Sequence, residues 1–220
     1  MKKKRSLFLF GDSICFGQSI SINNTWAFGL ASVIDKMFPK SQLVVQNFGI
    51  NGDTSRRALD RLRYDITSKA PDFMLIQFGM NDCNYWETDF GHARVSPEAF
   101  KANILEIVKK SSSAGVKHFF INTNHPSNKK INDDKVGGKY DANNRKYNDL
   151  IRKAFNHLSD QNYPVTLLDN EKAFESGICQ DSNIKNFLLS DGVHLNTKGH
   201  HIYAEFLIPK ILQILVPLLK

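Results

Sequence analysis

Five short apolar runs recur along the chain, and they show almost no alternation between apolar and polar positions. They cover residues 7–10, 43–47, 73–78, 117–122 and 165–169. Continuous apolarity is typical of strands that are buried on both faces, as in parallel sheets covered by helices. The pattern therefore predicts five strands of a parallel sheet.

Helix-length segments separate these runs, at residues 26–38, 54–69, 97–114 and 142–159. The third segment has a clear start, because Ser96 stands before Pro97 as an N-cap before a proline in the first turn. Gly115 follows its last apolar position as a C-cap. A final helix is expected from about Asn196 and Thr197, and Pro209 is expected to kink or end it.

Strands that alternate with helices predict an α/β fold, a doubly wound three-layer α/β/α sandwich. The chain has 220 residues, a size at which such proteins often form one domain, and no linker, repeat or low-complexity stretch divides it. We expect a single domain over residues 1–220, with residues 1–5 as a basic tail.

The formal net charge is +7, but the tail alone contributes four positive charges. Elsewhere basic and acidic residues alternate, as in Arg61, Arg63 and Asp65, and no basic helix with interleaved aromatic residues is present. A nucleic-acid partner is therefore not expected.

Two apolar segments bear on location in the cell. The run at residues 7–10 is too short for the hydrophobic region of a secretory signal, and the run at residues 208–219 is shorter than a bilayer span and contains Pro209 and Lys210. Three cysteines, Cys15, Cys83 and Cys179, cannot form a complete disulfide set. These features favour a cytoplasmic protein without stable membrane insertion.

Three short motifs follow the first three predicted strands: Gly11-Asp12-Ser13, Asn51-Gly52-Asp53 and Gly79-Met80-Asn81-Asp82. In open parallel sheets the carboxyl ends of the strands form the ligand crevice, so these motifs are expected to meet there. Each motif taken alone also fits a simple turn or helix cap. We assign Asp82 to holding its own loop.

A fourth motif, Asp191-Gly192-Val193-His194, precedes the final helix. With this spacing the carboxylate can accept from the imidazole Nδ1–H, which orients the ring and stabilises the imidazolium. A histidine on a loop is often merely solvated, so the argument rests on the four motifs together. They supply the nucleophile, oxyanion donors and acid/base pair that acyl transfer requires.

The order Ser, Gly, Asn, Asp-x-x-His resembles the SGNH hydrolases, also called the GDSL esterase/lipase family, over about residues 6–215. The resemblance implies a flavodoxin-like five-stranded sheet. It also implies that Ser13 is the nucleophile, His194 the general base and acid, and Asp191 its partner. The Ser13 and Gly52 N–H groups and the Asn81 amide would form the oxyanion hole. Ile14 and Met80 depart from the usual motif residues without changing a catalytic atom.

Loops after the third and fourth strands are expected to face the same crevice. Tyr85 and Trp86 follow the third motif, and His125 follows the fourth strand, so we predict these residues, with Asp12, as substrate contacts. Trp86 as a buried anchor and His125 as a surface residue are the alternatives. Aromatic and polar groups suit sugars or small polar esters.

The sequence thus predicts a carboxylic-ester hydrolase acting on short acyl or acetyl esters, including acylated sugars, without a metal or organic cofactor. An acyltransferase with the same triad, and a catalytically silent carbohydrate-binding module, are the alternatives. The oligomeric state is left open.

Overall fold

A computed structural model describes residues 4–39, 43–85, 90–129, 140–175 and 183–219. The described residues contain one sheet of five parallel strands in the order β2-β1-β3-β4-β5. The strands are β1 (Arg5–Gly11), β2 (Leu43–Gly49), β3 (Phe73–Gln77), β4 (His118–Asn122) and β5 (Val165–Leu168). The predicted five-stranded parallel sheet is confirmed.

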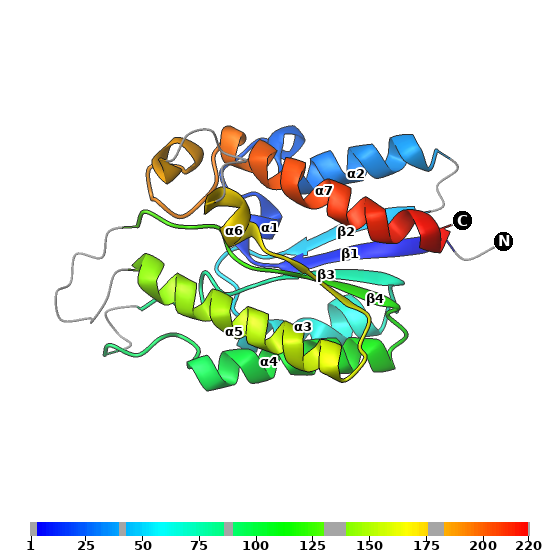
Figure 1. The fold of residues 1–220 in the computed structure, drawn as a ribbon, viewed down its shortest axis with the longest axis horizontal. Coiled ribbons are helices and arrows are strands. Elements are labelled where there is room, and N and C mark those ends of the chain that lie inside the picture. Colours follow the sequence, from blue (N-terminus) through cyan, green and yellow to red (C-terminus); the bar gives the residue numbers. More distant parts are fainter. Residues whose placement is uncertain (1–3, 40–42, 86–89, 130–139, 176–182, 220) are drawn as a thin grey trace.

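Helices cover both faces of the sheet (Figure 1). One face carries α1 (Ser13–Phe16), α2 (Trp26–Met37), α6 (Asn170–Glu175) and α7 (Thr197–Leu219), and the other carries α3 (Ser55–Leu62), α4 (Pro97–Ser113) and α5 (Tyr140–Asp160). Shorter turns are the 3₁₀ helices η1 (Ile22–Asn24) and η4 (Ile184–Phe187) and the π-helix η2 (Arg63–Thr67). This is the expected three-layer α/β/α sandwich.

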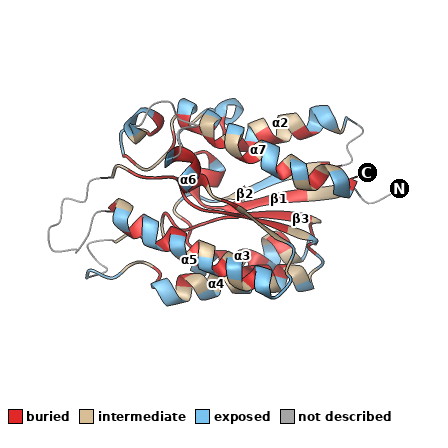
Figure 2. Ribbon diagram, viewed as in Figure 1, coloured by how far each residue is buried: buried red, intermediate tan, exposed pale blue. Residues whose placement is uncertain are grey.

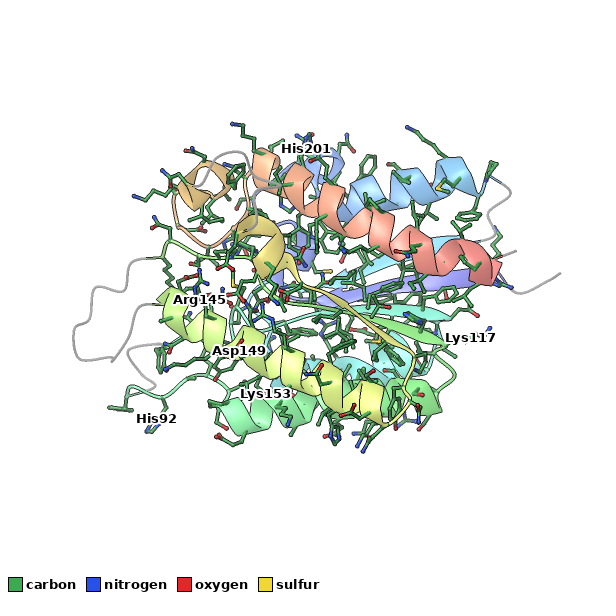
Figure 3. The ribbon with its side chains drawn as sticks, viewed as in Figure 1. His92, Lys117, Arg145, Asp149, Lys153 and His201 are labelled. Carbon is green, nitrogen blue, oxygen red and sulfur yellow. The ribbon has the colours of Figure 1, made fainter. Side chains whose placement is uncertain are left out.

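The core lies between these layers, and the central strands are buried along most of their length (Figure 2). All five residues of β3 are buried, which explains why this run shows no polar alternation. The edge strand β2 is partly exposed. Charged side chains lie outside, as Asp149 and Lys153 do on the exposed side of α5 (Figure 3).

Pro209, which was expected to kink or end the helix that begins at Thr197, does not end it. Helix α7 runs to Leu219 with Pro209 and Pro217 inside it. A stripe at four-residue spacing, Tyr203, Leu207, Ile211, Leu215 and Leu219, is buried and compensates for the hydrogen bonds that the prolines cannot make. Among the described residues α7 is the one helix whose length and mean hydropathy would suit a bilayer span.

Arg61 of α3 ties the carboxyl ends of β1 and β2 together. Its guanidinium donates to the Gly11 carbonyl at 3.1 Å and to the Phe48 carbonyl at 3.0 Å. It also pairs with the buried Asp53 carboxylate at 2.8 Å. Because each strand end carries one predicted motif, this side chain fixes their relative position.

Replacing Arg61 by methionine is expected to lower the free energy of unfolding by roughly 3 kcal/mol, because Asp53 and two carbonyls lose their charged donor. Arg57→Met is the matched control. Arg57 meets the same Asp53 at 3.6 Å but its side chain is 59% exposed, so its loss should cost less than about 1 kcal/mol. Urea denaturation of both variants measures the difference, and equal losses would contradict the role of Arg61.

Candidate active site

Ser13 is the first residue of α1, directly beyond the carboxyl end of β1. Asp12 caps this helix, since its Oδ1 accepts from the Ile14 N–H at 2.9 Å. The Asp12 N–H donates to the Gln77 carbonyl at the end of β3, at 3.2 Å. Ser13 is 4% exposed, so its hydroxyl lies in a largely desolvated position at the sheet edge.

The structure brings Ser13, His194 and Asp191 into one chain of hydrogen bonds. His194 Nε2 lies 2.8 Å from Ser13 Oγ, and His194 Nδ1 lies 2.6 Å from Asp191 Oδ2. The ring can therefore accept the serine proton at Nε2 while it donates from Nδ1–H to the carboxylate. Residues 181 positions apart meet with the geometry expected of a nucleophile, a base and an orienting acid.

Asp191 also organises its own turn. Burial alone raises the pKa of its carboxyl, but hydrogen bonds from the His194 ring and from the Val193 and His194 N–H groups outweigh burial and hold the pKa below its usual range. The two backbone donors reach Oδ1 at 2.8 and 3.0 Å. Asp191 is thus an anion at neutral pH and faces the side of the ring away from Ser13.

The loop after β4 holds this turn from behind. The Ser127 hydroxyl and the Asn128 N–H both donate to the Gly192 carbonyl at 2.8 Å. Gly192 has φ +69°, and a Cβ there would lie 2.8 Å from Asn128 and Lys129 backbone atoms. Only glycine therefore permits both the turn and the contact. Sequence analysis does not reveal this support, because nothing in the motif indicates which loop it would touch.

His125 belongs to the same support. It is fully buried, and its Nε2 lies 2.8 Å from the Val193 carbonyl. Burial lowers the pKa of its imidazole to about 4, so the ring is neutral and can donate to that carbonyl. The predicted contact with substrate would need an exposed side chain, which His125 does not have. Its ring instead supports the Asp191–His194 turn, which we call the catalytic turn.

The remaining predicted oxyanion donors lie on the loops after β2 and β3. Gly52 has φ +73°, a conformation that turns its loop sharply beyond β2. The Asn81 Nδ2 atom is buried without a hydrogen-bond partner among the described residues. The two loops are joined because the Ser55 N–H and hydroxyl donate to Asp82 Oδ1. This contact agrees with the assignment of Asp82 to holding its loop.

The other predicted substrate contacts are placed unevenly. Asp12 is fully buried beneath the nucleophile. Tyr85 is half-buried after the third motif. Trp86 lies outside the described residues. Of the aromatic residues predicted to contact substrate after the third motif, Tyr85 is therefore the one that the structure describes, and it is partly exposed.

Two cysteines near the motifs are poor nucleophiles. Cys15 and Cys83 are both fully buried. Burial raises the pKa of each thiol well above its ordinary value, so both are protonated at neutral pH. Cys179 lies outside the described part of the chain.

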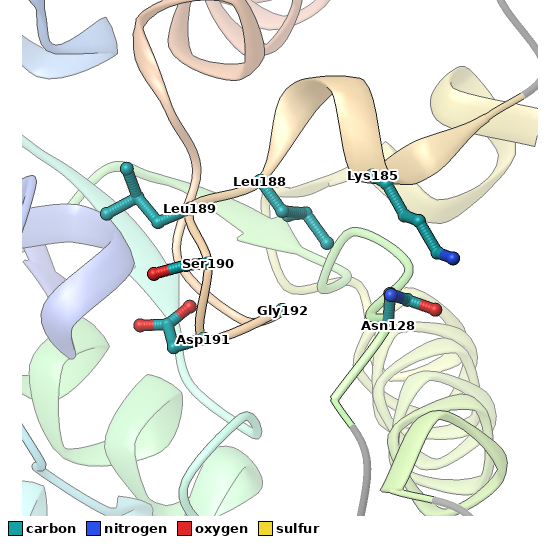
Figure 4. Close-up of a pocket in the computed structure, with 7 residues that line it drawn as sticks. All are labelled: Asn128, Lys185, Leu188, Leu189, Ser190, Asp191 and Gly192. Carbon is teal, nitrogen blue, oxygen red and sulfur yellow. The ribbon is translucent and has the colours of Figure 1, made fainter.

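A pocket of about 540 Å³ adjoins the catalytic turn (Figure 4). Lys185 and Asn128 lie across it from Ser190 and Asp191. Leu188 provides apolar lining. The mixture of charged, polar and apolar groups fits a small polar ligand. Within the described ranges no cluster of three or more His, Cys, Asp or Glu side chains has the arrangement of a metal site.

Comparison with known proteins decides the family. The profile of the GDSL-like lipase/acylhydrolase family matches residues 7–207. The chain belongs to this family. The match confirms both the resemblance drawn from the motifs and the expected enzyme class, carboxylic-ester hydrolase.

Curated relatives are distant but cover most of the chain. An arylesterase from Vibrio mimicus is 23% identical over 94% of this chain and 88% of its own length. The thioesterase 1/protease 1/lysophospholipase L1 of Escherichia coli K12 is 24% identical over 92% of this chain and 81% of its own. Axe2, an acetylxylan esterase from Geobacillus stearothermophilus, has the same fold, with a TM-score of 0.75, 20% identity and 96% of each chain covered.

Asp12 is expected to make stability depend on pH. Burial, with some contribution from Asp82 and Asp53, raises the pKa of its carboxyl from 3.8 to about 8. The folded state therefore keeps a proton that the unfolded state has lost, and the free energy of unfolding falls as pH rises toward 8.

The effect is isolated by comparing the wild type with Asp12→Asn from pH 6.5 to 8. The buried His125 and His200, whose pKa falls from 6.5 in the unfolded chain to about 4 on folding, contribute the same slope to both proteins, and the pKa of Asp82, which burial raises to about 6, lies below the interval. Asp12→Asn retains a capping side chain and should remove a slope of up to roughly 1.4 kcal/mol per pH unit. Urea denaturation across this interval measures the slope, and an unchanged slope in the variant would show that Asp12 is already ionised.

Proposed function

We propose that the protein is a serine esterase that hydrolyses carboxylic esters through an acyl-enzyme on Ser13. The observation that carries this proposal is the continuous contact from Asp191 through His194 to the Ser13 hydroxyl, at 2.6 and 2.8 Å. His194 takes the serine proton as Oγ attacks the ester carbonyl and then gives it to the leaving alcohol. Water, activated by the same ring, releases the acyl group.

The oxyanion formed at each step needs donors that are already in place. The Asn81 amide suits this role, since its buried Nδ2–H groups have no other described partner. A buried donor without a hydrogen-bond partner in the protein is costly, so an oxyanion that binds it would be stabilised. The N–H groups of Ser13 and Gly52 complete the proposed set.

For substrates we propose short acyl esters, including acetyl esters of carbohydrates. The polar pocket beside Asp191 supports small polar groups. The similarity to an arylesterase and to an acetylxylan esterase supports the same class. Transfer of the acyl group to a sugar hydroxyl would use the same atoms, and analysis of products with an acceptor present separates the two reactions.

Ser13→Ala is expected to abolish turnover of p-nitrophenyl acetate, because no other described group near His194 can attack the ester. Cys15→Ala is the matched control, since it changes a buried thiol two residues away and should keep most of the activity. Initial rates with both purified variants provide the measurement. Survival of the serine variant together with loss in the cysteine variant would move the nucleophile to Cys15.

Asn81→Ala is expected to reduce kcat by roughly 10²- to 10³-fold, the usual effect of removing one oxyanion donor. The variant should fold normally, because Nδ2 makes no hydrogen bond to another described residue. Steady-state kinetics and thermal unfolding give the two readouts. A change in kcat below about threefold would exclude Asn81 from the oxyanion hole.

Chain-length preference tests the substrate class. Rates on p-nitrophenyl esters from acetyl to palmitoyl are expected to be highest for the short acyl groups, since the pocket next to the catalytic turn contains charged and polar side chains. The comparison is made as kcat/KM below the solubility limit of each ester. A steady rise of kcat/KM toward palmitoyl would contradict the proposed substrates.

A further inference from the structure

Lys129 links two segments of the candidate active site, the Asp191–His194 turn and the loop after β3. Its N–H donates to the Ser127 hydroxyl at 3.1 Å, and that hydroxyl donates to the Gly192 carbonyl of the catalytic turn. Its side chain reaches the loop after β3, where Nζ lies 3.2 Å from Oδ1 of Asn84, three residues after Asn81. The lysine therefore lies between the turn that carries the proposed base and the loop that carries a proposed oxyanion donor.

The ring of Tyr140 holds the lysine in this position. Lys129 Nζ lies 4.8 Å from the ring centroid, and the Tyr140 hydroxyl donates to the Met80 carbonyl at 2.6 Å, directly before Asn81. A buried aromatic face and one amide oxygen are weak partners for an ammonium group with three N–H donors. These contacts hold the side chain in place, and among the described residues its ammonium group keeps N–H donors that can bind a ligand.

The charge of Lys129 has no carboxylate partner among the described residues. Arg61, Arg145 and Arg152 each contact at least two carboxylates, whereas no carboxylate among the described residues lies within ion-pair distance of Lys129. Burial lowers the pKa of its ammonium, and the catalytic Asp191 acts on it through the electrostatic field. A partly desolvated cation of this kind gains from an anionic partner more than an exposed lysine does.

These contacts identify a group on the substrate. We propose that Lys129 binds an anionic oxygen group, such as a carboxylate, on the acyl or the alcohol part of the ester, and so makes the enzyme prefer charged esters to neutral ones. The inference rests on the proposed esterase function. The net charge of +7 acts in the same direction, because it attracts anionic substrates to the surface.

Two pairs of esters test this preference and distinguish the two parts of the substrate. The acyl pair is p-nitrophenyl monosuccinate and p-nitrophenyl butyrate, and the alcohol pair is 4-acetoxybenzoate and phenyl acetate. For each pair the charged-to-neutral ratio of kcat/KM is compared between variants, so any general damage to the site cancels.

Lys129→Gln is expected to lower this ratio about tenfold in at least one pair, mainly through KM of the charged ester, because a charged contact is lost on binding. Lys129→Arg should keep most of the ratio. Lys153→Gln is the control, since it removes the same charge from the exposed side of α5, thirteen residues beyond Tyr140. An unchanged ratio in both pairs for Lys129→Gln would overturn the proposal.

A binding measurement separates this result from the fate of the proposed function. If the wild type hydrolyses none of the four esters, the esterase proposal fails, and the role of Lys129 is then read from binding alone. NMR titration of the Ser13→Ala variant with 4-acetoxybenzoate and monosuccinate ester gives the affinities. They should fall about tenfold for at least one ester when Lys129→Gln is added, and equal affinities for both would overturn the inference.

Discussion

The catalytic geometry depends on how one short turn is held. The Asp191–His194 turn is held beside Ser13 in part because the Gly192 and Val193 carbonyls accept hydrogen bonds from the loop after β4. Those donors come from Ser127, Asn128 and the neutral ring of His125. Without them the imidazole would be held only by the bonds of its own segment, such as the one from the Leu189 N–H to the His194 carbonyl. Its 2.8 Å contact with the serine hydroxyl would then lose part of the rigid support that efficient proton transfer requires.

A second set of contacts fixes the strand ends relative to one another. Arg61 joins the ends of β1 and β2, and Asp82 accepts from Ser55 to join the loops that carry Gly52 and Asn81. These polar groups are mostly buried, so each bond forms in a medium that strengthens it. The two carboxyl groups near Ser13 are held in different protonation states. Burial keeps Asp12 protonated, whereas hydrogen-bond donors keep Asp191 ionised.

The sequence pattern was sufficient for the layers, the strand positions and the family, because continuous apolar runs and strand-end motifs are local signals. The burial of His125 and the hydrogen bonds to the Gly192 carbonyl could not be predicted from the sequence, because they depend on which loops meet in space. Pro209 shows the same limit: as a local signal it can end a helix, but α7 continues past it with a buried stripe from Tyr203 to Leu219. Arg61 shows no signal either, since a basic residue on an amphipathic helix normally indicates an exposed face.

The 181 positions between Ser13 and His194 have a consequence for biosynthesis. A polypeptide growing from its amino terminus contains the nucleophile, Gly52 and Asn81 long before the ribosome adds the imidazole. In the proposed mechanism such a nascent chain holds a Ser13 without the base that deprotonates it, so it would not hydrolyse esters. In that mechanism activity begins only when the Asp191–His194 turn, one of the last segments to be made, docks against the sheet, so ester cleavage would report that the sandwich has closed.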